Sequence, residues 1–189
     1  DIDAAIAKCL DHQGWILGPE VKELEESIAR YLGVKHCIGA SSGTEALVLS
    51  LRALSHKLRG KGFFEKSDQI ITTPFTFVAT ADAILRCGAT PVFVDIDPVT
   101  FDLDVAQVEK YLQTNPSNVV GIIPVHLYGH AAEMDKILEL ARSHKLFVLE
   151  DVAQAFGGKY KGKMLGSMGE TGAFSFFPSK NLGGFGDGG

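Results

Sequence analysis

The chain has 189 residues, of which 46% are hydrophobic and 22% are charged, a composition typical of a folded domain with a sizeable core. Its formal net charge of −5, without any basic stripe, argues against a dedicated nucleic-acid binder. No apolar run approaches the roughly 20 residues that span a bilayer, and the first residues, which read as helical from Asp1, show no secretory pattern. The three cysteines are scattered and odd in number, so we expect a reducing, cytoplasmic setting and not a disulfide framework.

The first elements are predicted from helix signals. Pro19 stands at the first position of a helix whose apolar residues recur at helical spacing, and Gly33 ends it. A short strand is predicted at 36–39. A second helix then opens at 41–44 and carries leucines at 47, 51 and 54.

From there, strands and helices alternate. Strands are predicted at 69–72, 91–95, 119–125 and 146–151, and helices at 78–87, 104–112 and 133–144. Short, β-branched-rich strands separated by helices are typical of a mostly parallel sheet that helices cover on both faces. The tail adds a predicted hairpin at 159–164 and a strand at 172–177. The expected fold is therefore α/β with three layers.

Three features at strand ends are candidates for chemistry, because ligands of such sheets bind beyond the carboxyl ends of the strands. The Ser41–Thr44 turn before a helix suits a phosphate, although an ordinary serine N-cap gives the same pattern. Asp151 ends a strand and would pair with a protonated heterocycle, bind a metal, or cap the next helix. Lys180 lies among aromatic residues and glycines, where desolvation would make its amine nucleophilic, but a surface lysine is the common case.

Other motifs are weaker. Residues 157–164 have the glycine and lysine spacing of a P-loop, but Met164 stands where a Ser or Thr should reach magnesium, and the context is a hairpin. The glycines of 184–189 satisfy G-x-G-x-x-G, yet they follow many elements instead of a first strand. Gly129 separates His126 from His130 and breaks any shared helical face, so no metal site is expected.

Taken in order, seven segments resemble the DegT/StrS-type sugar aminotransferases, which have the type I, aspartate-aminotransferase-like pyridoxal-phosphate fold. The resemblance covers nearly the whole chain, and its strength lies in the order of the segments. They are 18–20, 42–47, 73–80, 91–97, 124–129, 150–155 and 174–183.

The resemblance implies a role for each candidate residue. Lys180 would hold pyridoxal 5′-phosphate as an internal aldimine and then act as the general base, while Asp151 would keep the pyridine nitrogen protonated. Gln154 would lie near the phenolic oxygen and Phe77 would stack on the ring. The phosphate would be held by Gly43, Thr44 and Ser175.

The implied function is the transfer of an amino group from an amino acid, in this family usually glutamate, to a nucleotide-linked keto sugar by a ping-pong mechanism. Relatives with histidine at the lysine position dehydrate sugars, so Lys180 favours transamination. The resemblance further implies a homodimer with shared active sites. Residues 1–189 would form the cofactor-binding large domain, with the extreme N-terminus and a C-terminal small domain outside this chain.

Two other functions remain open from the residues alone. A P-loop nucleotide hydrolase would use 157–163, and a non-enzymatic relative would bind the cofactor or a sugar for regulation. These residues do not identify the nucleotide, the sugar or the aminated carbon. The sequence of residues 178–183 favours 3-keto sugars slightly over 4-keto sugars.

Overall fold

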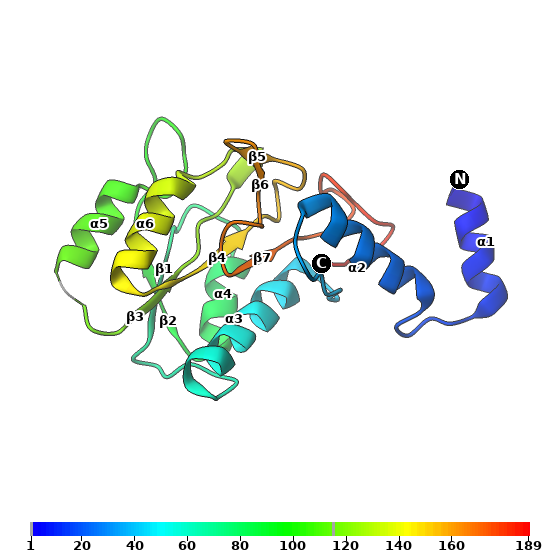
Figure 1. The fold of residues 1–189 in the computed structure, drawn as a ribbon, viewed down its shortest axis with the longest axis horizontal. Coiled ribbons are helices and arrows are strands. Elements are labelled where there is room, and N and C mark those ends of the chain that lie inside the picture. Colours follow the sequence, from blue (N-terminus) through cyan, green and yellow to red (C-terminus); the bar gives the residue numbers. More distant parts are fainter. Residues whose placement is uncertain (1, 115) are drawn as a thin grey trace. The chain divides into compact units, whose positions relative to one another are not determined.

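A computed structural model describes residues 2–114 and 116–189 of the chain (Figure 1). These residues form two compact units, one reaching to Gly39 and the other running from Ala40 to Gly189. The helical start expected at Asp1 lies outside the described residues, and the first described helix begins at Ile2. No helix in the described ranges is both long and apolar enough to cross a bilayer.

The first unit contains two helices, α1 (Ile2–His12) and α2 (Pro19–Leu32). Helix α2 begins and ends as predicted, with Pro19 in its first turn and Gly33 in the left-handed conformation (φ 71°) at its end. The strand predicted at 36–39 is wrong: the segment forms no strand. The backbone N–H of Gly39 donates instead to the Glu25 side chain at 2.7 Å, so this N–H is not available to a strand ladder.

The second unit is built on a parallel sheet. Its strands are β1 (Gln69–Thr72), β2 (Thr90–Phe93), β3 (Val119–Ile122), β4 (Phe147–Asp151) and β7 (Thr171–Ala173). They lie in the order β2-β1-β3-β4-β7, and each neighbouring pair is parallel. Three strands end earlier than predicted, and Pro124, which has no N–H to donate, lies just beyond β3.

Helices cover both faces of this sheet. Helices α3 (Gly43–Arg59) and α4 (Ala79–Arg86) pack on one face, and α5 (Val105–Gln113) and α6 (Met134–His144) on the other (Figure 1). Successive strand residues alternate between the two cores, so that Ile70 joins the first and Ile71 the second. The predicted three-layer α/β fold is thus confirmed.

The predicted hairpin is also confirmed. Strands β5 (Lys159–Tyr160) and β6 (Lys163–Met164) pair antiparallel. The two residues between them, Lys161 (φ 48°) and Gly162 (φ 85°), have the positive φ angles of a tight two-residue hairpin turn. The P-loop spacing of 157–164 therefore lies on a hairpin and not on a strand-to-helix turn.

The strand order places a topological switch beside β1. The chain crosses from β1 to β2 on one side and then returns to β3 on the other side of β1. At such a point the connections leave in opposite directions and open a crevice at the carboxyl edge of the sheet, where ligands bind. Short turns after β3, including the single-turn helix η1 (Leu127–Gly129), line this edge.

Candidate functional site

A cavity of about 520 Å³ lies at this edge, within the usual size of a small-molecule site. Its walls come from the start of α3, the segments that follow β1, β3 and β7, and the end of β4. All seven residues selected from the sequence line it: Gly43, Thr44, Phe77, Asp151, Gln154, Ser175 and Lys180. The fold therefore brings together in space what is dispersed along the chain.

The N-terminus of α3 forms one wall. The Ser42 hydroxyl oxygen accepts the Glu45 N–H at 3.1 Å, which makes Ser42 the N-cap. The N–H groups of Gly43 and Thr44 have no hydrogen-bond partner among the described residues. The serine thus caps the helix, as one interpretation of the sequence expected, and two donors at the positive end of the helix remain for an anion.

Asp151 forms the deep end of the site. The side chain is 4% exposed, and its two oxygens accept the Thr80 hydroxyl at 2.8 Å and the Ala153 N–H at 3.2 Å. Burial raises the pKa of this carboxyl above its usual value, against the opposing effects of the Thr80 hydrogen bond, the Ala153 N–H and the charge of Lys180. A buried carboxylate with one donor per oxygen retains lone pairs for a cationic or N–H partner.

Lys180 and Phe77 lie nearer the opening. Lys180 is partly exposed, in a turn closed by its N–H on the Phe177 carbonyl at 2.8 Å. Its ammonium group makes no hydrogen bond or ion pair within the described part of the chain, so the amine is available to a ligand. Phe77 is 68% exposed and lines the cavity wall.

Gln154 is oriented by the backbone. Its amide oxygen accepts the Tyr128 N–H at 3.2 Å, so its NH₂ group remains as a donor for a ligand. Tyr128 (φ 54°) and Gly129 (φ 82°) both adopt the left-handed conformation in the turn that presents this N–H.

Sequence reasoning missed several polar residues of the site. Thr76, Thr80 and Asp187 also line the cavity. The bond between Thr80 and Asp151 joins the first turn of α4 to the end of β4, and no local pattern indicates such a pairing. For Thr76 and Thr80 the available signals were that the segment 73–80 follows a predicted strand and is one of the seven resembling segments.

Directly beside Asp151, Glu150 is fully buried and faces away from the cavity into a hydrogen-bond network. Its Oε2 accepts Gly166 N–H at 2.8 Å and lies 3.1 Å from His126 Nε2, and its Oε1 accepts two further N–H groups at 2.7 and 2.8 Å. Because Ala132 N–H donates to His126 Nδ1 at 3.1 Å, the ring proton is on Nε2 and is donated to Glu150. Burial alone would raise the pKa of Glu150, but the His126 and backbone hydrogen bonds outweigh it and the pKa is lowered.

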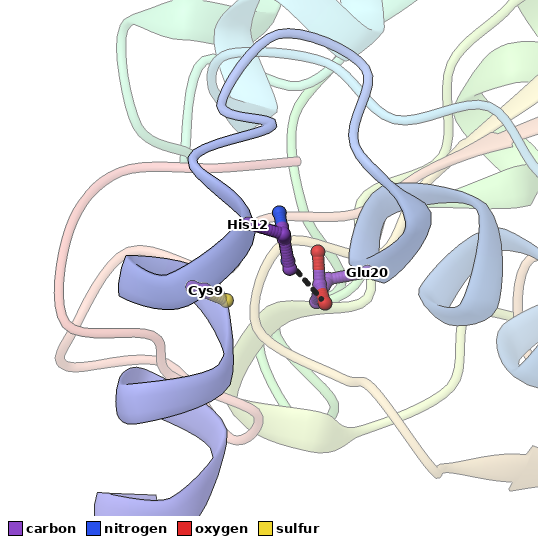
Figure 2. Close-up of side chains that lie close together, drawn as sticks. All are labelled: Cys9, His12 and Glu20. Carbon is purple, nitrogen blue, oxygen red and sulfur yellow. Dashed lines mark hydrogen bonds and ion pairs between the residues drawn. The ribbon is translucent and has the colours of Figure 1, made fainter.

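The histidines considered as metal ligands do not converge. His126 pairs with Glu150, and His130 with Asp102 at 2.5 Å, while Glu133 pairs with Lys136. Within 2–114 and 116–189, three potential ligands gather only in the first unit, at Cys9, His12 and Glu20 (Figure 2).

In that cluster His12 and Glu20 already have partners within the protein. Gly14 N–H donates to His12 Nδ1 at 2.9 Å, so His12 Nε2 carries the proton that it donates to Glu20 at 3.0 Å. The Lys8 ammonium group lies 3.4 Å from the same Glu20 oxygen. Neither ring nitrogen therefore has a lone pair free for a metal ion.

The chain is similar in sequence to curated proteins over most of its length. The chain is 51% identical over 93% of its length to a pleiotropic regulatory protein of Geobacillus stearothermophilus, covering 44% of that protein. It is 47% identical over its whole length to the UDP-N-acetyl-3-dehydro-α-D-glucosamine 3-aminotransferase of Acidithiobacillus ferrooxidans, covering 48% of it. The chain thus spans about half the length of the curated relatives that it matches.

The fold is also similar to that of solved structures. The crystal structure of Streptomyces venezuelae DesV in complex with a ketimine intermediate is 41% identical and superposes with a TM-score of 0.90 over 98% of this chain and 47% of that one. A family profile matches residues 1–189 in full. The chain belongs to the DegT/DnrJ/EryC1/StrS aminotransferase family.

Proposed function

We propose that the protein is a pyridoxal-phosphate-dependent aminotransferase that moves an amino group from an amino acid, glutamate, to a nucleotide-linked keto sugar. Family membership supports the reaction class, and the name of the 47% identical relative supports a nucleotide sugar with the keto group at C3. One observation carries the proposal: a buried carboxylate, an unpaired lysine amine and the open N-terminus of a helix share one cavity.

The phosphate end of the cavity fits the cofactor. Gly43 and Thr44 offer free N–H groups and Ser175 a hydroxyl, and the helix dipole of α3 favours a negative charge there. A Cβ built on Gly43 would come within 2.6 Å of the Ser175 Cβ. The close approach of these residues makes a narrow cradle that a larger side chain would fill.

The ring end fits as well. Asp151 would bind the ring nitrogen, because a protonated pyridine supplies the cation that a buried carboxylate requires. The NH₂ group of Gln154 would donate to the phenolic oxygen, and Phe77 would cover one face of the ring. Asp151 and Gln154 each keep hydrogen-bonding capacity that the described residues do not use, and that capacity suits a part of the cofactor.

Lys180 would carry out the proton transfer. Bound pyridoxal phosphate supplies an electron sink for the negative charge that develops when the α-carbon of the donor loses its proton. The Lys180 Nζ would hold the cofactor at rest and then, as a free amine, take that proton and return it to the cofactor carbon on the other side of the transferred nitrogen. A lysine here, where the resemblance associates histidine with dehydration, supports transamination.

We further infer that residues 1–189 form the cofactor-binding large domain and that the protein works as a cytoplasmic homodimer. Helix α1 supports dimerisation, because it exposes Ile2, Ile6 and Leu10 at a spacing of four residues along one side. The cytoplasmic setting is supported by the three cysteines, all of which are free thiols.

Regulatory binding without catalysis is a second candidate, because the 51% identical relative is named as a pleiotropic regulatory protein. In that case the cavity would bind its ligand but would not turn over an amino donor. The two functions differ in what glutamate does to the bound cofactor.

The test is the visible absorption spectrum of the purified protein with pyridoxal phosphate, before and after glutamate, for wild type, Lys180→Ala and the exposed hairpin control Lys159→Ala. We expect a visible band in wild type and Lys159→Ala that glutamate bleaches with release of 2-oxoglutarate, and no such band in Lys180→Ala. A band that glutamate leaves unchanged would support regulatory binding. A wild-type protein without any band would refute the cofactor itself.

A further inference from the structure

Thr80 contacts the reactive end of the site without belonging to the expected cofactor ligands. Its side chain is 1% exposed and lies in the first turn of α4. The hydroxyl oxygen is 2.8 Å from Asp151 Oδ2, 3.0 Å from Thr76 Oγ1 and 3.4 Å from the Phe77 carbonyl oxygen. A hydroxyl has a single proton and can serve only one of these acceptors well.

The distances decide where this proton goes. The carboxylate is the nearest acceptor and the only charged one, and hydrogen bonds to charged groups are about twice as strong as neutral ones. The Phe77 contact is long for an O–H donor. Thr80 therefore donates to Asp151, and its oxygen is left to accept the hydroxyl of Thr76.

The three residues thus form a chain of hydrogen bonds that runs from Thr76 through Thr80 to Asp151. This chain fixes Oδ2, while Ala153 N–H fixes Oδ1. The carboxylate is anchored at both oxygens, and its remaining lone pairs belong to the cavity that Asp151 lines. Removing the Thr80 hydroxyl would leave Oδ2 buried without a protein donor.

We infer that Thr80, oriented by Thr76, is a positioning residue that holds the Asp151 carboxylate ionised and aimed at the ring nitrogen of the cofactor. The inference rests on the proposed function. A carboxylate that loses its donor becomes more basic, so the proton shared between it and the ring nitrogen would move towards Asp151. The ring would then be less often protonated and a weaker electron sink.

The experiment measures ring protonation directly, by the ¹⁵N NMR shift of pyridoxal phosphate labelled at the ring nitrogen and bound to the purified protein. The dissociation constant of the cofactor is measured alongside it. We expect Thr80→Val to move the signal towards that of a neutral pyridine and to weaken binding about tenfold, because a carboxylate that is no longer held in place loses its charge-assisted hydrogen bond from the ring N–H. Thr80→Ser, which keeps the hydroxyl, should restore both values.

A matched control is Thr72→Val. Thr72 is equally buried, but its hydroxyl donates to the Ile123 carbonyl at 3.0 Å and has no contact with Asp151. We expect this variant to lose stability without a change in the ¹⁵N shift. If Thr80→Val does not fold, Thr76→Val, which removes only the donor to Thr80, should shift the signal in the same direction by a smaller amount.

Two results would overturn the inference while the proposed function stands. One is a wild-type ¹⁵N shift in a folded Thr80→Val or Thr76→Val protein, and the other is an equal displacement in Thr72→Val. A wild-type protein that binds no cofactor would instead refute the proposed function, and the assignment of Thr80 with it.

Discussion

Gly43 and Ser175 lie so close that a Cβ at position 43 would come within 2.6 Å of the Ser175 Cβ and 3.2 Å of its Cα. One residue begins α3 and the other follows β7, so this contact joins two segments from distant parts of the sequence. The approach is possible only because Gly43 has no side chain. It places the free N–H groups of the helix beside the Ser175 hydroxyl, which is the geometry that an anion requires.

Gly43→Ala should therefore damage the phosphate end of the site. The added methyl group would push α3 and Ser175 apart, and we expect binding of pyridoxal phosphate to weaken at least about tenfold. The measurement is a fluorescence titration with the cofactor. Gly62→Ala is the control, because its Cβ would meet nothing closer than an arginine side-chain nitrogen at 3.7 Å. Wild-type affinity in Gly43→Ala would show that no ligand binds in this cradle.

Asp151→Asn should stabilise the cofactor-free protein and weaken cofactor binding. Burial raises the pKa of Asp151 in the folded chain. For a raised pKa, the contribution to stability is full below the unfolded value and is lost as pH rises through the folded value. At neutral pH the ionised carboxylate therefore costs stability.

Thermal unfolding of both cofactor-free proteins checks this expectation. The variant should unfold at the higher temperature near neutral pH, and its advantage should shrink as pH falls towards about 4. Adding pyridoxal phosphate should then reverse the order, since only wild type offers the carboxylate. A variant less stable than wild type at neutral pH without cofactor would contradict the expected cost of the buried charge.

Much of the site could be predicted because of where its residues occur. Asp151 ends a strand and Lys180 follows one, and the carboxyl ends of parallel strands share one edge of a sheet. Strand and helix signals alone therefore place these two residues near one another, whereas Phe77, Gln154 and Ser175 were indicated by the family resemblance. The alternation of predicted strands and helices likewise indicated the layered fold before any contact was known.

What could not be predicted depends on contacts between distant segments. The strand expected at 36–39 failed because an apolar run shows the capacity to pair but not the presence of a partner. The bond between Thr80 and Asp151 depends on how α4 packs on the sheet. A glutamate next to Asp151 gave no sign that it would be buried, since its donors are backbone N–H groups of a later turn.

Lys163→Ala should leave cofactor binding and amino transfer unchanged. The P-loop interpretation requires this lysine on a strand-to-helix turn facing a phosphate, whereas it lies exposed at the start of β6 in the hairpin. The amino-transfer rate and the affinity for a nucleoside triphosphate measure the two possibilities. Loss of nucleotide binding in this variant would revive the hydrolase interpretation.

Glu150 should be essential to folding stability and should make that stability depend on pH. Each of its carboxylate oxygens receives two hydrogen bonds, from Gly166 and His126 at Oε2 and from Met168 and Gly169 at Oε1. In Glu150→Gln, the NH₂ group must face two donors whichever way the amide turns. We expect a loss of about 2–3 kcal/mol in the free energy of unfolding, and more for Glu150→Ala, which leaves all four donors without an acceptor.

The pH dependence of this loss distinguishes the effect of the Glu150 charge from the effect of side-chain packing. The pKa of Glu150 is lowered in the folded chain, so its contribution is present above the unfolded value of about 4.3 and is lost as pH falls through the folded value. Urea unfolding at decreasing pH should therefore bring wild type and Glu150→Gln closer together only in acid. Glu133→Gln, in an exposed pair with Lys136, should change stability by no more than about 1 kcal/mol. A gap between wild type and Glu150→Gln that stays constant down to acid pH would mean that packing, and not the ionised carboxylate, holds the turn that leads into β7.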